Sequence, residues 1–245
     1  MQLSVIVPTY NERERLAELV ERILDVYRRA GVRGEVVIVD DNSPDGTGEL
    51  AQQMAAQRPD VKVVRRPAKL GLGSAAMDGF RAASGDVLGV MDADFSHPPA
   101  LLPRMLEVIV NDDADFVIAS RYVPGGSTEG WPFRRWIMSR LACLIARPLT
   151  PVRDATSGYF LVRRRAITGT DISAHGFKIA LELLVRGSAR SVIEVPYVFS
   201  ERLAGASKMN THEALGYFGQ VWRLLLFRSS AARRHIRPAY GTRPA

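Results

Sequence analysis

The chain has 245 residues, of which 47% are hydrophobic, and this is enough for a sizeable core in one large α/β domain or two small ones. Its one cysteine, Cys143, excludes an intramolecular disulfide and a cysteine-based zinc site, and it favours a reducing compartment. No apolar run approaches the roughly 18 residues that a membrane span needs, and no signal peptide is expected because a strand begins almost at once.

The net charge of +7 is unevenly distributed. Residues 196–245 carry eight Lys or Arg against two Glu, whereas the first 195 residues are nearly balanced. A basic tail indicates an anionic membrane surface or nucleic acid as a partner, or it is a solvated segment that aids solubility. Because the arginines lie beside apolar helical patterns and in no recognised nucleic-acid motif, we expect no nucleic-acid partner.

Short apolar runs alternate with helical patterns through the first half of the chain. Strands are predicted over residues 3–7, 35–39, 61–64, 87–91 and 116–120. Helices are predicted over 12–30, with Asn11 as N-cap, then from 47 to about 58, from 71 to about 83, and from 98 onwards. This alternation predicts an α/β fold with right-handed crossovers and a largely parallel sheet.

Polar residues follow the ends of these strands, which is where ligands bind in parallel α/β sheets. The most informative motif is Asp92-Ala93-Asp94, directly after the apolar run 87–91. Two carboxylates at the tip of a buried strand can hold a hard divalent cation, and the cation can hold a diphosphate. An acidic pair by itself is equally well explained as a solvated loop, so the metal interpretation depends on the surrounding motifs.

Two amphipathic helices are predicted in the second half of the chain, over about 133–149 and 213–228. On the second, one face is lined by Leu215, Phe218, Trp222 and Leu225. Both patterns fit helices that pack on a core, and both also fit helices that lie at a membrane interface beside arginines. The basic segment directly after the second helix favours the membrane interface.

Three segments together are highly specific: residues 5–12 (VIVPTYNE), 39–47 (VDDNSPDGT) and 91–98 (MDADFSHP). They resemble the inverting family 2 glycosyltransferases with the GT-A fold, and within them the dolichol-phosphate (polyprenol-phosphate) mannose synthases. Further matching segments are Gly71-Leu72-Gly73, 120–122, 131–133, Asp154 with Ser157-Gly158, and 202–209.

The resemblance covers about residues 3–227. It implies a GT-A catalytic domain, Rossmann-like with a mostly parallel sheet, over residues 1–228, followed by a basic tail over 229–245. Members with transmembrane segments carry them after this point, whereas the sequence ends at residue 245, so it resembles a member without that module. We therefore expect peripheral contact with the inner, cytoplasmic face of the membrane, or contact supplied by a separate membrane protein.

The resemblance also implies a donor site. The positions that hold the donor nucleoside correspond here to Pro8, Tyr10, Glu12, Val39 and Asp41. Asp92 and Asp94 match the ligands of a Mg²⁺ or Mn²⁺ cofactor, and Ala93 matches a nucleotide contact. Some relatives have a further glutamine ligand where this chain has Ser96, and because serine is shorter we expect a bridging water there.

Phosphate-binding positions of the family correspond to Arg121 and Arg135 for the acceptor, with Ser139 beside them, and to Arg202 and Lys208 for the donor. Arginine presents a planar fork to phosphate oxygens, so several arginines on one wall suit two phosphorylated substrates. Any single arginine could be an ordinary surface charge, but these fall inside matching motifs.

The implied reaction is inverting transfer of mannose from GDP-mannose to a polyprenol monophosphate. A phosphate monoester has its second pKa near ~6, so at neutral pH it is already a nucleophile and needs no general base. Asp154 is the first residue to test if a base exists. Three alternatives stay open: a polyprenyl-phosphate glucosyltransferase that uses UDP-glucose, a non-catalytic nucleotide-sugar-binding protein, and transfer to a protein or polysaccharide hydroxyl, which would again need a base.

Overall fold

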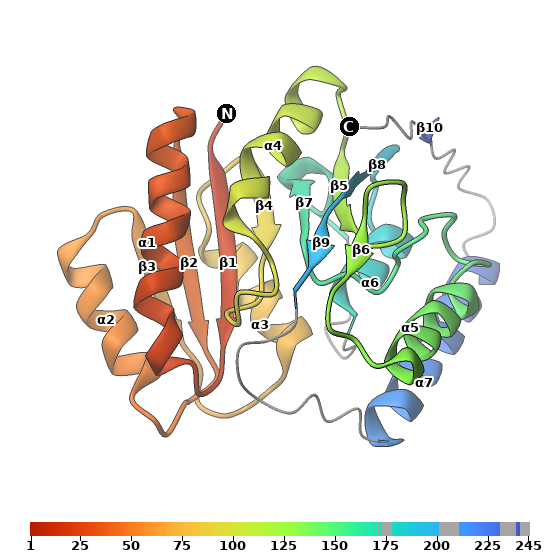
Figure 1. The fold of residues 1–245 in the computed structure, drawn as a ribbon, viewed down its shortest axis with the longest axis horizontal. Coiled ribbons are helices and arrows are strands. Elements are labelled where there is room, and N and C mark those ends of the chain that lie inside the picture. The colour runs from red at the N-terminus through yellow and green to blue at the C-terminus, as the bar shows by residue number, and fades with distance from the viewer. Residues whose placement is uncertain (171, 173–177, 201–210, 231–238, 241–245) are drawn as a thin grey trace.

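The computed structural model describes residues 1–170, 172, 178–200, 211–230 and 239–240 of the chain (Figure 1). The strands of the main sheet are β1 (Leu3–Thr9), β2 (Gly34–Asp40), β3 (Val61–Arg65), β4 (Val87–Val90), β5 (Phe116–Ser120), β7 (Phe160–Arg163), β8 (Ser191–Pro196) and β10 (Ala239–Tyr240). A second sheet consists of β6 (Ser127–Thr128) and β9 (Val198–Phe199).

The helices are α1 (Arg13–Ala30), α2 (Thr47–Gln57), α3 (Leu72–Ala82), α4 (Leu102–Asn111), α5 (Phe133–Ile145), α6 (Ile179–Arg186) and α7 (Thr211–Ser230), with short 3-10 turns η1 (Pro99–Leu101) and η2 (Arg164–Ala166). The first helix begins one residue later than predicted. Asn11 is not its N-cap: it has a positive φ of 61°, and Glu12 occupies the capping position.

The strand order of the main sheet is β10-β8-β5-β7-β4-β1-β2-β3. Every pair in it is parallel except those of β7, which runs antiparallel to β4 and β5. The predicted α/β fold with a mostly parallel sheet is therefore confirmed. The sequence did not reveal β7, because its three apolar residues followed by Arg163 are too short a run to show a periodicity that separates a strand from other buried chain.

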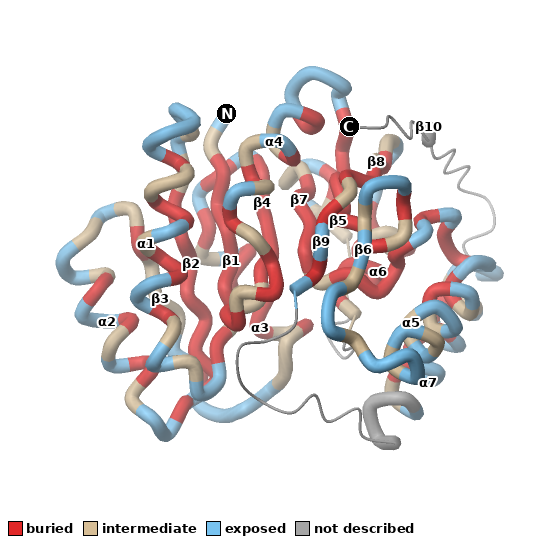
Figure 2. Tube along the Cα trace, in the orientation of Figure 1, coloured by how far each residue is buried: buried red, intermediate tan, exposed pale blue. Residues whose placement is uncertain are grey.

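Helices cover both faces of the sheet, with α1 and α4 on one face and α3 and α6 on the other (Figure 1). The central strands are buried almost throughout (Figure 2), which explains why they read as unbroken apolar runs in the sequence. On α1, the predicted stripe of Leu16, Leu19, Val20, Ile23, Leu24 and Tyr27 is buried. The covered sheet leaves its carboxyl edge as the place where loops and polar groups collect.

The helices α5 and α7 pack side by side at one end of the molecule (Figure 1), where the Tyr217 hydroxyl donates to the Ala142 carbonyl at 2.7 Å. On α7, Tyr217, Val221 and Leu224 are buried in this contact. Most of the predicted apolar face instead points to solvent: Leu215, Phe218 and Trp222 are 71%, 54% and 64% exposed, whereas Leu225 packs against these buried residues. Of the helices within the described residues, none combines the length and the apolar character that a membrane crossing requires.

Candidate active site

The loops after β1 and β2 are joined by hydrogen bonds from consecutive backbone amides. Asn11 N–H donates to Ser43 Oγ at 3.1 Å, and Glu12 N–H donates to Thr47 Oγ1 at 3.0 Å. Arg13 N–H donates to the Asp45 carboxylate at 3.1 Å. Hydrogen bonds from Thr47 lower the pKa of Asp45, although partial burial acts in the opposite direction. The turn residues of 42–47 therefore fix the start of α1 beside the carboxyl edge of the sheet.

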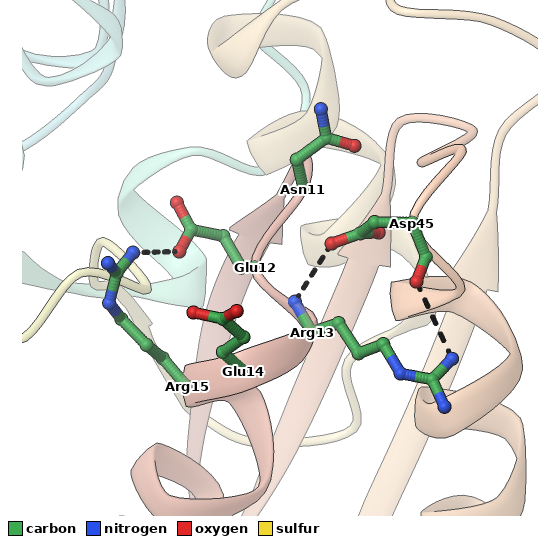
Figure 3. Close-up of a pocket in the computed structure, with 6 residues that line it drawn as sticks. All are labelled: Asn11, Glu12, Arg13, Glu14, Arg15 and Asp45. Carbon is green, nitrogen blue, oxygen red and sulfur yellow. Dashed lines mark hydrogen bonds and ion pairs between the residues drawn. The ribbon is translucent and has the colours of Figure 1, made fainter. Parts of the chain in front are cut away.

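A cavity of about 380 Å³ lies at this junction. It is lined by Asn11, Glu12, Arg13, Glu14, Arg15 and Asp45 (Figure 3). Of the residues expected at the nucleoside, only Glu12 lines it, and its carboxylate reaches Arg15 at 3.1 Å (Figure 3). The cavity is thus the margin of the predicted donor site, and the acidic pair 92–94 does not line it.

Tyr10 and Asp41 are both engaged by the segment that follows β3. The Lys69 ammonium lies 3.8 Å from the centre of the Tyr10 ring, a cation–π contact. The buried Asp41 carboxylate is paired with Arg66 and accepts the Gly71 N–H at 3.0 Å. A carboxylate has about four acceptor positions, so Asp41 keeps capacity for a base or ribose. Sequence reasoning missed Arg66, whose buried position is not visible in a run of surface-like charges.

The remaining nucleoside residues differ in what they can offer a ligand. Pro8 is half-buried. Val39 is fully buried with Ile6 and Val37 in the core, so its side chain cannot contact a nucleotide and the expected contact is restricted to its backbone. The Val39 carbonyl already accepts from Thr9 Oγ1 at 3.3 Å.

The acidic pair lies just beyond the end of β4, at the carboxyl edge of the sheet. Asp94 is buried, and its Oδ1 accepts hydrogen bonds from Ser96 N–H at 3.0 Å and Ser96 Oγ at 2.5 Å. Ser96 is itself 2% exposed, and its two hydrogen bonds hold the Asp94 carboxylate in place. The Asp92 side chain is 27% exposed, and no hydrogen bond from another described residue reaches its carboxylate. A Cβ added to Gly158 would stand 3.7 Å from both of its oxygens.

These residues fit a Mg²⁺ or Mn²⁺ ion held together with a substrate. Within the described residues, no three His, Cys, Asp or Glu side chains form a closed metal site. A cation held by only one or two carboxylates completes its shell with waters and substrate phosphate oxygens, which is the usual mode for Mg²⁺. Asp92 and Asp94 would therefore hold a cation most firmly when a diphosphate is present.

The residues expected at the acceptor phosphate come together around Trp131. The guanidinium groups of Arg121 and Arg135 lie 5.2 and 4.1 Å from the centre of the Trp131 ring. Ser139 joins them through Tyr122, whose hydroxyl donates to Ser139 Oγ at 2.7 Å. One wall therefore carries two arginines and a hydroxyl, donated by the β5 loop and by α5.

Arg121 is held by the buried carboxylate of Asp154. Its Nε and Nη2 donate to the two carboxylate oxygens at 2.7 and 2.6 Å, and its backbone N–H donates at 2.9 Å. Burial acts against both charges, but the pairing wins, so Asp154 raises the pKa of Arg121 and Arg121 lowers the pKa of Asp154. A fully buried carboxylate with a lowered pKa is a weak proton acceptor, so Asp154 is not suited to be a general base.

Lys178, at the start of α6, is a site residue that sequence reasoning missed. The buried Gln220 of α7 binds its backbone with two hydrogen bonds. The Lys178 N–H donates to Gln220 Oε1 at 3.3 Å, and Gln220 Nε2 donates to the Lys178 carbonyl at 3.1 Å. Burial and the neighbouring Arg121 lower the pKa of Lys178, whereas Asp92 and Asp154 act in the opposite direction. The ammonium thus lies within electrostatic range of Asp92 on one side and of Arg121 with its partner Asp154 on the other. Arg202 and Lys208 lie outside the described residues.

Comparisons with known proteins show the family and the fold of this chain. The profile described as glycosyl transferase family 2 matches residues 4–169. A dolichol-phosphate mannosyltransferase of Pyrococcus furiosus is 44% identical over 92% of this chain, and the chain spans 64% of that protein's length. A polyprenol monophosphomannose synthase of Mycolicibacterium smegmatis is 43% identical over 86% of this chain and 83% of its own. A dolichol-phosphate mannosyltransferase of Saccharomyces cerevisiae is 36% identical over 94% of this chain and 90% of its own length.

Solved structures support the fold. Glucosyl-3-phosphoglycerate synthase of Mycobacterium tuberculosis, in complex with Mn²⁺, uridine diphosphate and glucosyl-3-phosphoglycerate, has a TM-score of 0.67 at 22% identity, over 94% of this chain and 80% of that one. Mannosyl-3-phosphoglycerate synthase of Rubrobacter xylanophilus has a TM-score of 0.64 at 16% identity, over 98% of this chain and 78% of that one. The profile match and the similarity to the yeast and mycobacterial proteins show that this chain belongs to glycosyl transferase family 2.

Proposed function

We propose that this protein transfers mannose from GDP-mannose to a polyprenol (dolichol-type) monophosphate, with inversion at the sugar C1 and with a divalent cation. The observation that carries the proposal is the identity of 43% and 36% to two lipid-phosphate mannosyltransferases over 83% and 90% of their lengths. The site geometry supports it, because an acidic pair and an arginine wall meet at one sheet edge, as two phosphorylated substrates require.

On the donor side, Asp92 and Asp94 would hold Mg²⁺ or Mn²⁺, which as a Lewis acid stabilises the charge that develops on the departing diphosphate. Tyr10, which is 37% exposed and carries Lys69 on one face of its ring, and Asp41, with spare acceptor positions, would bind the nucleoside. Glu12 lines the adjoining cavity. Arg202 and Lys208 remain proposed phosphate contacts on the evidence of their motif alone.

On the acceptor side, the guanidinium pair of Arg121 and Arg135 would hold the lipid phosphate, and Ser139 would add a hydroxyl. The task of this wall is orientation, since a phosphate dianion is already a nucleophile at neutral pH. This assignment agrees with the buried Asp154, whose carboxylate accepts three hydrogen bonds from Arg121 and one from Thr156 Oγ1 at 3.3 Å, which uses its four acceptor positions.

The acceptor's lipid tail requires a membrane next to this wall. Exposed apolar side chains on α5 and α7 supply a surface for it: Phe133, Trp136, Met138, Leu141 and Leu144 on α5, and Leu215, Phe218, Trp222 and Leu226 on α7. We place the protein peripherally on the inner face of the membrane, with these helices in the interface. A separate membrane protein could supplement this contact.

The function is tested by incubating the protein with a short polyprenyl phosphate and either GDP-mannose or UDP-glucose, followed by mass analysis of the lipid. We expect a hexosyl lipid from GDP-mannose, little from UDP-glucose, and none in EDTA. A product formed only from UDP-glucose would replace the donor assignment. No product from either donor would support a binding protein without catalytic activity.

Asp92→Asn and Asp94→Asn should each reduce kcat by about a thousandfold or more, because each removes a ligand charge from the cation that stabilises the leaving group. The matched control is Asp113→Asn, which makes the same chemical change before β5, at the opposite edge of the sheet, on a side chain that is 82% exposed. Full turnover by either site variant would show that the acidic pair does not carry the cation.

A further inference from the structure

His97 makes a hydrogen bond to the loop that carries the acidic pair. The Asp92 N–H donates to His97 Nδ1 at 3.0 Å. The other ring nitrogen, Nε2, lies 3.9 Å from Asp92 Oδ2. Because Nδ1 accepts, a neutral ring carries its proton on Nε2, and its accepting nitrogen is turned to the backbone instead of to a cation. His97 therefore contacts the first predicted metal ligand from two directions without being placed as a ligand.

The His97 ring is held rigidly. It is 2% exposed and stacks on Tyr159 with ring centres 4.9 Å apart at 19°. The Tyr159 hydroxyl donates to the carbonyl of Pro98, next to His97, at 2.9 Å. Edge-on contacts at 6.1 Å from Tyr197 and Phe199 close the ring on its other sides. A ring fixed in this way gives its hydrogen bond a fixed direction.

The same aromatic group reaches the acceptor wall. The Phe199 ring lies 5.7 Å from the Arg121 guanidinium carbon and 5.9 Å from that of Arg135. Packed side chains thus run without interruption from the loop of Asp92 to the two arginines. Within this group, His97 makes the hydrogen bond to the Asp92 backbone.

We propose that His97 is a positioning residue for the donor site: by accepting the Asp92 N–H from a clamped ring, it fixes the direction in which the Asp92 carboxylate faces the cation. This inference rests on the proposed function only in assuming a cation between Asp92 and the donor diphosphate. Groups that orient a metal ligand in this way typically change metal affinity by about 10–100-fold when they are replaced.

Three substitutions separate this role from packing. His97→Asn places an amide oxygen near the position of Nδ1 and can keep the bond to Asp92, but it loses the aromatic stack. His97→Phe keeps the stack and loses the bond. His97→Gln carries its amide near the position of Nε2 and loses the Nδ1 contact while remaining polar. Tyr197→Phe is the control, since it removes only a hydroxyl from the same aromatic group and keeps the ring against His97.

The measurement is Mn²⁺ binding to the full chain, alone and with GDP, followed by the electron paramagnetic resonance of free Mn²⁺, together with thermal unfolding in EDTA. We expect His97→Phe and His97→Gln to bind Mn²⁺ at least about tenfold more weakly, and His97→Asn and Tyr197→Phe to stay within about threefold of the native chain. A packing role alone predicts the opposite order, with Phe tolerated best and Asn worst in both measurements.

Native Mn²⁺ affinity in a folded His97→Phe protein would reduce His97 to a packing residue, and affinity as weak in His97→Asn as in His97→Phe would show that the hydrogen bond is not what matters. Should His97→Phe fail to fold, His97→Gln gives the same comparison. The lipid-product assay decides the function separately. If the native chain and its variants bind Mn²⁺ in the predicted order but the native chain makes no hexosyl lipid, the proposed function is overturned and this inference stands.

Discussion

At the scale of single residues, the pair of Arg121 and Asp154 shows how burial decides a role. Both side chains are almost removed from water, so each charge is tolerated only because the other is present. Three donated bonds from Arg121 use the carboxylate as a support. A carboxylate held in this way is ionised at neutral pH and stays so, which makes it a fixed countercharge and not a proton acceptor that cycles during turnover.

Asp154→Asn should therefore behave as a structural change. We expect the free energy of unfolding to fall by about 3 kcal/mol, because Arg121 is left buried without its countercharge. The KM for the lipid phosphate should rise, since the guanidinium group is no longer held in one place. Urea unfolding and steady-state kinetics measure the two effects.

A base role for Asp154 would give a different result: a fall in kcat of about 10²–10⁴-fold with stability unchanged. Combining Asp154→Asn with Arg121→Gln gives a further check. The double variant should lose less stability than the sum of the single variants, because removing both charges leaves none unpaired. Simple additivity of the two losses would contradict a direct pairing.

At the scale of elements, Glu35 connects three strands and a loop. From its place on β2, its carboxylate accepts hydrogen bonds from Ser4 Oγ on β1 at 2.7 Å and from Ser84 N–H before β4 at 2.6 Å. Lys62 on β3 reaches it at 2.9 Å. Burial opposes the charge, but the hydrogen bonds from Ser84, Ser4 and Lys62 outweigh it and lower the pKa of Glu35 from 4.5 to about 2.

The lowered pKa makes the stability of this sheet edge sensitive to acid. Because the folded-state pKa lies below the unfolded one, Glu35 stabilises the fold fully above about pH 4.5, and the contribution disappears as the pH falls through about 2. Glu35→Gln should lower the free energy of unfolding at pH 7 by roughly 2 kcal/mol. The difference from the native chain should shrink at pH 3.5 and nearly vanish at pH 2, as followed by urea unfolding.

The control for Glu35 is Glu18→Gln on α1, where the side chain is 57% exposed and, among the residues that the structure describes, pairs only with Arg22. A surface pair of this kind contributes about 0–1 kcal/mol, so little change is expected at any pH. A constant difference between Glu35→Gln and the native chain from pH 7 to pH 2 would show that the lost stability comes from shape and not from charge.

At the scale of the whole molecule, one end differs from the rest of the surface. The helices α5 and α7 bury a joint core against α6 and turn large apolar side chains to solvent. Figure 2 shows exposed residues along both helices. Phe133 and Trp222 are 72% and 64% exposed. Apolar side chains of this size on two neighbouring helices mark an interaction surface. Arg135 and Ser139 on α5 place that surface next to the proposed acceptor site.

Phe133→Ser combined with Trp222→Ser should weaken binding to vesicles of mixed neutral and anionic lipids. If each side chain is half inserted, the pair contributes roughly 2–3 kcal/mol, so binding should fall by at least about tenfold. Sedimentation with vesicles measures it. The matched control is Val110→Ser on α4, which removes an apolar side chain that is 51% exposed elsewhere on the surface. Equal losses in the control and the double variant would exclude a specific membrane face.

Much of the fold follows from the sequence, since buried parallel strands read as continuous apolar runs and the helix of residues 13–30 repeats with a helical period. The antiparallel β7 could not be predicted, because a strand's direction is set by the connection that returns it between β4 and β5, and not by its own residues. The resemblance named the residues of the site but not their surroundings: the buried side chain of Val39 and the engagement of Asp41 by Arg66 both depend on tertiary packing.

The sequence alone was enough to predict the acidic pair after the fourth strand, the turn of residues 42–47 and the apolar stripe of α7. Each of these features depends only on residues within a few positions of one another. Tertiary structure alone decided which side of that stripe faces solvent, that Asp154 is the countercharge of Arg121, and that His97 holds the Asp92 backbone. Burial and the partner of a charge are properties of residues far apart in the chain, and they become fixed only when the sheet and its covering helices come together.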